Sequence, residues 1–155
     1  MFYVANISLS KDIVGEGYNV TIDWTVANEA SSPKTFNITL RRNATLVYTK
    51  QLTLEGADSA ELSLAWDTEG FPYGTYMITI GLNETEYQCH DVVVTISGDV
   101  DGDRDVDIFD IVLMAGVYGD YIPPDWPLPP QDIDGDSDVD IFDIVIAAGN
   151  YGKSW

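Results

Sequence analysis

The stretch Asp99-Val-Asp-Gly-Asp-Arg-Asp-Val-Asp-Ile-Phe-Asp110 returns almost unchanged as Asp132-Ile-Asp-Gly-Asp-Ser-Asp-Val-Asp-Ile-Phe-Asp143. Each copy alternates aspartate with other residues and runs directly into an apolar segment. The octet Asp-Val-Asp-Ile-Phe-Asp-Ile-Val is identical at 105–112 and 138–145, a separation of 33 residues. This repetition predicts a duplicated structural unit.

Both copies have the ligand spacing of an EF-hand loop. Carboxylates stand at the first, third, fifth and twelfth positions, the seventh position of such a loop supplies a backbone carbonyl, and the ninth acts through water. An all-carboxylate cage with a bidentate last acid favours Ca²⁺ over the smaller Mg²⁺. We therefore expect two Ca²⁺ ions. The expected ligand positions are Asp99, Asp101, Asp103, Asp105, Asp107 and Asp110 in the first loop, and Asp132, Asp134, Asp136, Asp138, Asp140 and Asp143 in the second.

Two features depart from the EF-hand pattern. The sixth position, which favours glycine at positive φ, holds Arg104 in one loop and Ser137 in the other. The twelfth ligand is aspartate in place of glutamate. The alternative interpretation, a solvated acidic tail, explains neither the strict spacing nor the repeated octet.

Charge is distributed unevenly along the 155 residues. Residues 1–97 have five basic and twelve acidic residues, a net charge of −7, whereas residues 98–155 have two basic and fourteen acidic residues, a net charge of −12. Such a balance argues against nucleic acid or an anionic membrane surface as a partner, because both require a basic patch.

The remaining chemistry-bearing residues are few. Cys89 is the single cysteine and His90 the single histidine, so there is no internal disulfide and no closed zinc site, and we expect Cys89 to be buried in a strand. No apolar run is long enough to span a membrane, and the N-terminus lacks the features of a signal peptide. We expect a fragment of a longer secreted protein, located outside the cell or on its surface.

Alternating apolar and polar residues predict seven strands in the first part of the chain. Short strands with turns at this spacing indicate an antiparallel, immunoglobulin-like β-sandwich, with Trp24 and Trp66 in its core. The expected strands are Tyr3–Leu9, Tyr18–Asn28, Lys34–Arg41, Thr45–Leu54, Ala60–Trp66, Gly74–Leu82 and Cys89–Ile96.

This segment resembles the CARDB-type immunoglobulin-like modules of archaeal and bacterial cell surfaces. The resemblance rests on Ser-Lys-Asp-Ile-Val-Gly-Glu-Gly-Tyr-Asn-Val-Thr-Ile at 10–22, on Val26-Ala27-Asn28, and on Trp66-Asp67-Thr68 with Gly74-Thr75-Tyr76. It covers most of residues 3–97.

Five asparagines stand in Asn-X-Ser/Thr sequons and are candidates for N-glycans. The same triplets also arise from strand alternation alone, because residues two apart face the same side of a strand. The sequence leaves both explanations open. The asparagines are Asn6, Asn19, Asn37, Asn43 and Asn83.

Each acidic loop is expected to continue as one helix, Ile108–Tyr118 and Ile141–Tyr151, ending at Gly119 and Gly152. Val92–Ile96 reads as a strand, so the first loop lacks the preceding helix of an EF-hand. Paired loop-helix repeats of this kind, at 99–119 and 132–152 and joined by the proline-rich linker 120–131, resemble a dockerin of the archaeal type.

The resemblance implies a small all-α dockerin domain at 98–155 that docks onto a cohesin and follows the sandwich at 1–97. In dockerins the tenth and eleventh loop positions carry much of the partner choice. Because these positions are identical in the two repeats, a partner would bind in either of two orientations.

Apolar side chains also surround the predicted helices in greater number than a module of this size can bury. We expect the surplus to form a partner-binding surface. The alternative is that these side chains pack on the sandwich or on the proline linker. The candidate residues are Ile108, Phe109, Val112, Ile141, Phe142 and Val145.

The leading hypothesis is a noncatalytic, extracellular, calcium-dependent module that anchors its parent protein to a cohesin domain of a scaffold or surface protein. The second hypothesis is a structural stalk whose calcium repeats pack within the chain. An enzyme is not expected, because the sequence marks no nucleophile and base pair.

Overall fold

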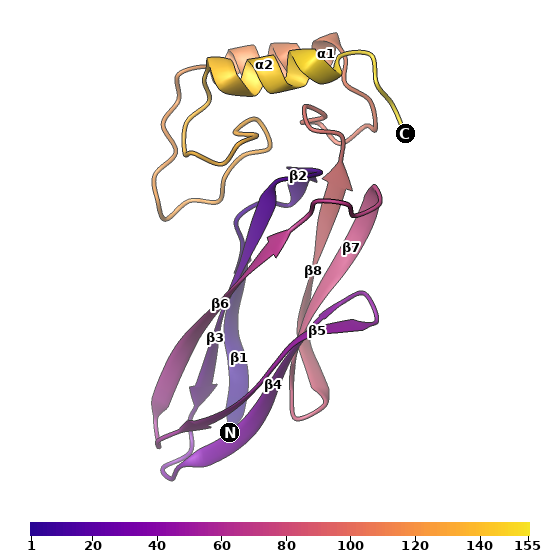
Figure 1. Ribbon diagram of the computed structural model, residues 1–155. Coiled ribbons are helices and arrows are strands. Elements are labelled where there is room, and N and C mark those ends of the chain that lie inside the picture. Colours follow the sequence, from indigo (N-terminus) through magenta and orange to yellow (C-terminus); the bar gives the residue numbers. More distant parts are fainter. The chain divides into compact units, whose positions relative to one another are not determined.

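Eight strands and two short helices make up the protein, shown in Figure 1. This computed structural model describes the backbone of residues 1–155 and the side chains of residues 1–85 and 89–155. The strands are β1 (Phe2–Leu9), β2 (Ile13–Gly15), β3 (Asn19–Asn28), β4 (Lys34–Arg42), β5 (Thr45–Leu54), β6 (Asp58–Asp67), β7 (Gly74–Leu82) and β8 (Thr85–Thr95). The helices are α1 (Ile108–Gly116) and α2 (Ile141–Asn150).

The strands form two sheets, a three-stranded sheet in the order β1-β3-β6 and a five-stranded sheet in the order β2-β8-β7-β4-β5. All seven predicted strands are present, with ends that differ by a few residues. The eighth, β2, was not predicted, because three residues next to a glycine are too short to show alternation. It pairs in parallel with β8, with Ile13 opposite Val93.

Contacts divide the residues into two compact units. The first consists of Met1–Ser8, Ile22–Leu64 and Tyr76–Asp91, and the second of Leu9–Thr21, Ala65–Thr75 and Val92–Trp155.

The first unit is held together by the inward faces of its strands. β3 alternates buried and less buried residues, and its Ile22 and Trp24 are almost completely buried. Trp24 makes an edge-to-face contact with Tyr48 at 5.5 Å between ring centroids, and Phe2 stacks on Phe36 at 5.7 Å. Aromatic burial of this kind dominates core energetics, so the predicted place of Trp24 in the core is confirmed.

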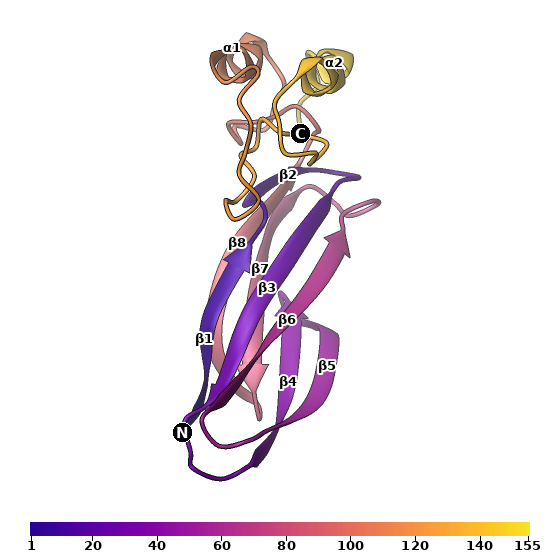
Figure 2. The same cartoon turned by 90° about the vertical axis from the view of Figure 1, so that its left-hand side faces the viewer.

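The second unit has its own apolar cluster, formed by Val100, Met114, Ile133 and Ala147. Each repeat therefore contributes one residue from its loop and one from its helix. The helices α1 and α2 lie side by side in both Figure 1 and Figure 2. Gly98 allows this packing, because a Cβ atom there would lie 2.7 Å from the Cα atom of Ala147.

The predicted fold class is wrong in its second half. The chain is mostly β-structure, and its two helices have only nine and ten residues. The second compact unit combines the loop-helix repeats with Leu9–Thr21 and Ala65–Thr75, so the repeats do not stand as a separate all-α domain. Sequence periodicity missed this because it reports local structure, whereas the grouping depends on long-range contacts. The ranges 1–97 and 98–155 stay a prediction.

The exposure of Cys89 and the length of the two helices bear on two further expectations. Cys89 is exposed, so its predicted burial is wrong. Neither helix is long and apolar enough to cross a bilayer, a statement that covers the residues described.

Candidate metal centre

The first acidic loop begins four residues after β8 ends. Asp99 is buried, and its carboxylate accepts hydrogen bonds from the amides of Gly102 (2.7 Å) and Arg104 (3.1 Å) and from the hydroxyl of Thr95. The loop therefore wraps around its own first acid.

The twelfth position of this loop is also part of the start of α1. Asp110 is 1% exposed, and its two carboxylate oxygens accept hydrogen bonds from the amides of Val100 (2.7 Å) and Asp107 (2.8 Å). The Asp107 carboxylate accepts in turn from the amide of Phe109 at 2.6 Å, which completes a capping box. One carboxylate thus closes the loop and begins the helix.

The second loop repeats four of these backbone hydrogen bonds, to its first and last acids. Asp132 accepts from the amides of Gly135 (2.7 Å) and Ser137 (3.2 Å), as Asp99 does from its counterparts. Asp143 is fully buried and accepts from the amides of Ile133 (2.6 Å) and Asp140 (2.9 Å). The sequence duplication is therefore a structural duplication as well.

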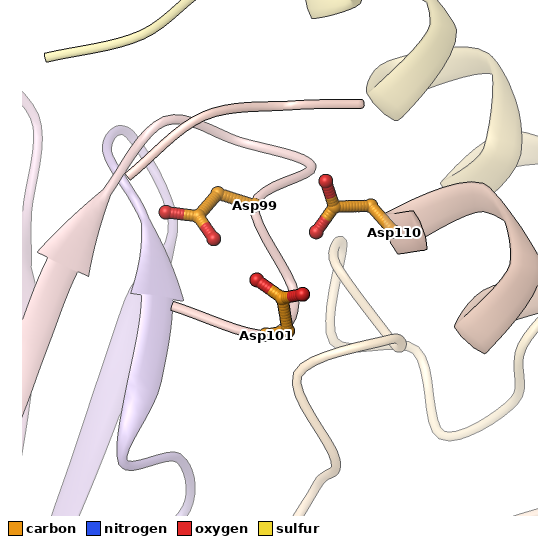
Figure 3. Close-up of side chains that lie close together, drawn as sticks. All are labelled: Asp99, Asp101 and Asp110. Atoms are coloured by element: carbon orange, nitrogen blue, oxygen red, sulfur yellow. The ribbon is translucent and has the colours of Figure 1, made fainter. Parts of the chain in front are cut away.

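Carboxylates converge in both loops. Those of Asp99, Asp101 and Asp110 approach one another in Figure 3. Among the residues whose side chains are described, three groups have ligand oxygens within 4.8 Å of one another: Asp99 with Asp101 and Asp110, Asp105 with Asp107 and Asp110, and Asp132 with Asp134 and Asp136. The predicted ligands outside these groups are Asp103, Asp138, Asp140 and Asp143.

Several observations fit a cation. The Oδ1 atoms of Asp105 and Asp138, at equivalent positions of the two loops, are buried and accept no hydrogen bond. Such orphaned acceptors are costly unless something pairs with them. Burial raises the pKa of Asp99 and of Asp132 above the usual value, because loss of solvation disfavours the charged form of a carboxylate, and at Asp132 the nearby Lys11 ammonium offsets only part of this effect. These acidic groups are suited to bind a metal ion.

The residues at the sixth positions adopt the backbone conformation that favours glycine. Arg104 has φ of 83° and Ser137 has φ of 79°, so the turn is kept without glycine. The guanidinium of Arg104 lies over the ring of Trp155, 5.1 Å from its centroid, which offsets part of the strain in the first loop.

Ser137→Gly is therefore expected to raise the free energy of unfolding by about 0.5–1 kcal/mol, since the relief of left-handed strain exceeds the added entropy of the unfolded chain. Thermal unfolding in saturating calcium measures the effect. The matched control is Gly135→Ala, because Gly135 has φ of 80° and its Cβ would meet only Leu128 at 3.8 Å. Gly135→Ala should lower the melting temperature. A melting temperature of Ser137→Gly that is equal to or below that of the unaltered protein would contradict the strain argument.

The two repeats brace each other through the segments that follow their helices. After α2, Gly152 donates to the carbonyl of Val106 (2.7 Å) and Trp155 donates to the carbonyl of Arg104 (3.0 Å). After α1, Gly119 donates to the carbonyl of Val139 (2.7 Å), and Ile122 donates to the carbonyl of Ser137 (2.8 Å). The chain leaving each helix thus holds the acidic loop of the other repeat.

Two side chains that sequence reasoning did not select support the first acids of the loops. Thr95 donates to Asp99 and accepts from the indole of Trp155 at 2.9 Å. Lys11 is 3% exposed, and its ammonium donates to the carbonyls of Asp132 and Ile133. No local signal marks either role, because both lie outside the repeated stretch and reach it through the fold.

The six candidate partner-binding residues are exposed, each over 51–65% of its surface. They occupy equivalent places on the two helices: Ile108, Phe109 and Val112 on α1, and Ile141, Phe142 and Val145 on α2. Met114, by contrast, is buried in the cluster. Tyr118, two residues beyond the end of α1, is also exposed. Whether the six residues bind a partner stays a prediction.

No protein-family model and no curated protein matches the sequence. Among solved structures, the chain is similar to the CARDB domain of a Pyrococcus furiosus protein in complex with di-metal ions, with 20% identity and a TM-score of 0.53. That match covers 61% of this chain and 88% of the other. This chain has a CARDB-like β fold. The predicted CARDB-type resemblance is supported at the level of fold.

Two enzymes contain a similar β-structure as a minor part. An alkylpurine DNA glycosylase of Pseudomonas fluorescens bound to DNA gives a TM-score of 0.53 at 7% identity, covering 60% of this chain and 30% of that one. A β-glucosidase of Erythrobacter marinus gives 0.51 at 11% identity, covering 61% and 15%. At such identities the CARDB-like fold is shared and nothing more.

Proposed function

We propose that this chain is a noncatalytic, calcium-dependent docking module, which binds a cohesin-like protein partner through the exposed apolar residues of α1 and α2. The observation that carries the proposal is the position of those residues. In each repeat, the last acid of the loop is buried at the third position of the helix, and the tenth and eleventh residues of the loop begin the same helix and point apolar side chains into solvent.

Calcium would act through the dual role of Asp110 and Asp143. Each carboxylate closes a loop and caps a helix, so an ion that fixes the carboxylate also fixes the direction of the helix. Two Ca²⁺ ions, one to a loop, are the proposed complement. A set of carboxylates that can supply six or more oxygens in a flexible arrangement suits Ca²⁺ better than the smaller Mg²⁺.

The apolar residues that follow the loops have the chemistry of an interface core, where aromatic and aliphatic side chains supply most of the binding energy. They are duplicated, which supports two alternative orientations of one partner. The strongly negative charge of the chain supports a protein partner over nucleic acid or direct membrane insertion. An extracellular or cell-surface setting, where calcium is abundant, and N-glycans on the exposed sequon asparagines belong to the same proposal.

The test is a binding measurement with immobilised cohesin domains in calcium and in EDTA. Retention of this chain by at least one cohesin in calcium, and its release by EDTA, is the expected result. If the protein binds calcium but no cohesin of a broad panel retains it, the docking function is contradicted.

The second candidate is a structural stalk, in which the metal loops stiffen the chain and have no separate partner. It is favoured by contacts inside the second compact unit, where Lys11 donates to the second loop and Leu128 donates to the carbonyl of Ser10 at 2.8 Å. Calcium-dependent stability without any cohesin binding would support this candidate.

A further inference from the structure

The two acidic loops are duplicates in sequence and hydrogen bonding, yet their surroundings differ in charge. The first acid of loop one, Asp99, has a neutral donor beside it, the hydroxyl of Thr95. The first acid of loop two, Asp132, has a buried cation beside it, the ammonium of Lys11. Four pairs of backbone amides around the first and last acids match within 0.1 Å, and the second loop adds one long bond from the amide of Asp134 to Asp143 (3.3 Å), so the clearest difference is the charge beside the first acid.

Lys11 is built into the second loop from another part of the chain. Its Nζ atom donates to the backbone carbonyls of Asp132 and Ile133, 121 and 122 residues away. Asp132, Asp134 and Asp143 are the carboxylates whose charges act on this ammonium. All these residues belong to the second compact unit.

The first loop has a cation of a different kind. Arg104 stands at its sixth position, but the side chain is exposed and its guanidinium lies over Trp155. A charge in solvent is screened by water and salt, whereas a buried charge acts through a lower effective permittivity. The charge of Arg104 therefore repels a cation in the first loop less strongly than the charge of Lys11 does in the second.

We propose that Lys11 is a fixed internal cation that makes the two calcium sites unequal, with the first loop the tighter site and the second the weaker one. This inference rests on the proposed binding of two Ca²⁺ ions and adds a specificity-determining residue to it.

The direction follows from electrostatics. Calcium affinity rises with the negative charge of the ligand set, and a buried positive charge beside the ligands repels the entering divalent ion. The hydrogen bonds of Lys11 also order the start of the loop, which favours calcium binding. They go to neutral carbonyls, however, so their stabilising energy is smaller than the repulsion between the ammonium and the divalent ion.

Two single-site variants test the inequality without altering Lys11. Asp101→Asn disables the first loop and Asp134→Asn the second, and both residues are exposed. Calorimetric titration with calcium alone should show the site left in Asp134→Asn to be about tenfold tighter than the site left in Asp101→Asn, or tighter still. Equal affinities, or the reverse order, would overturn the proposal.

Lys11 itself is tested in the Asp101→Asn background, where only the second loop binds. Lys11→Met should tighten this site about tenfold, and Lys11→Arg, which keeps the charge, should leave it unchanged. Lys50→Met in the same background is the matched control, since Lys50 is an exposed lysine of the first compact unit, and it should have no effect. A weaker or unchanged site in Lys11→Met would overturn the proposal, since a merely structural residue can only weaken the site when it is lost. If the unaltered protein binds no calcium, the proposed function itself is contradicted. Two sites of equal affinity would contradict only the role of Lys11.

Discussion

Chelation is expected to abolish most of the helical signal of this protein and to leave its β-structure in place. Each loop holds six aspartates, and residues 98–155 have a net charge of −12, so the loops repel themselves when no cation is present. Helices of nine and ten residues are not stable alone in water. Their N-terminal caps depend on Asp110 and Asp143, whose carboxylates are the same groups that an ion would fix.

The size of the effect follows from linkage. An ion present at a thousand times its dissociation constant stabilises the folded state by about 4 kcal/mol, so two such ions exceed the stability of many small domains. Far-UV circular dichroism before and after EDTA measures the loss of helix, and hydrogen exchange locates it. The amides of β4 and β5, in the first compact unit, are the internal reference and should keep their protection.

The control for a specific effect is the restoration of the signal by calcium but not by an equal concentration of magnesium. Asp110→Asn together with Asp143→Asn should show little helix in either condition. An unchanged helical signal after chelation would contradict the coupling of metal binding to folding.

The sequence was most informative where structure is local. Alternation located β3 and β4 within one residue at each end, because each strand has one buried face and polar residues on the other. The helices were located equally well at their starts, since the aspartate before Ile108 or Ile141 caps the helix and accepts from the amide two residues on. Their ends were placed up to two residues too far.

The sequence was least informative where distant segments meet. Nothing around Lys11 predicts that its ammonium is buried against the second loop, and nothing around Trp155 predicts that its indole reaches Thr95. These contacts depend on long-range packing in the second compact unit, and the same packing overturned the expected separate helical domain. Metal ligands, by contrast, are close in sequence, so spacing alone was enough to nominate them.

The second large effect is expected at the exposed helix faces. Phe109 and Phe142 are 65% and 63% exposed, the most exposed of the six candidate residues, and they stand at equivalent positions. Phe109→Asp combined with Phe142→Asp places a charge in both copies of the proposed interface core. Binding to a cohesin that retains the unaltered protein should fall by at least about a hundredfold, the size of a lost hot spot.

Single variants distinguish one binding orientation from two. If either repeat serves as the docking face, Phe109→Asp alone should weaken binding only about twofold, because the other repeat still offers an intact face, and Phe142→Asp alone should behave alike. Leu46→Asp is the control for a general effect of an added charge, since Leu46 is an exposed apolar residue of the first compact unit. Calcium titration of every variant shows whether the loops are intact.

The outcome separates the two proposed functions, because in a stalk these side chains have no partner to lose. A double variant that binds calcium and cohesin as the unaltered protein does would place the docking face elsewhere on the chain. A double variant that loses calcium as well would show that the phenylalanines support the loops. The docking proposal requires a double variant that still binds calcium but no longer binds cohesin. That result fits helices that calcium orients and whose apolar residues bind the partner.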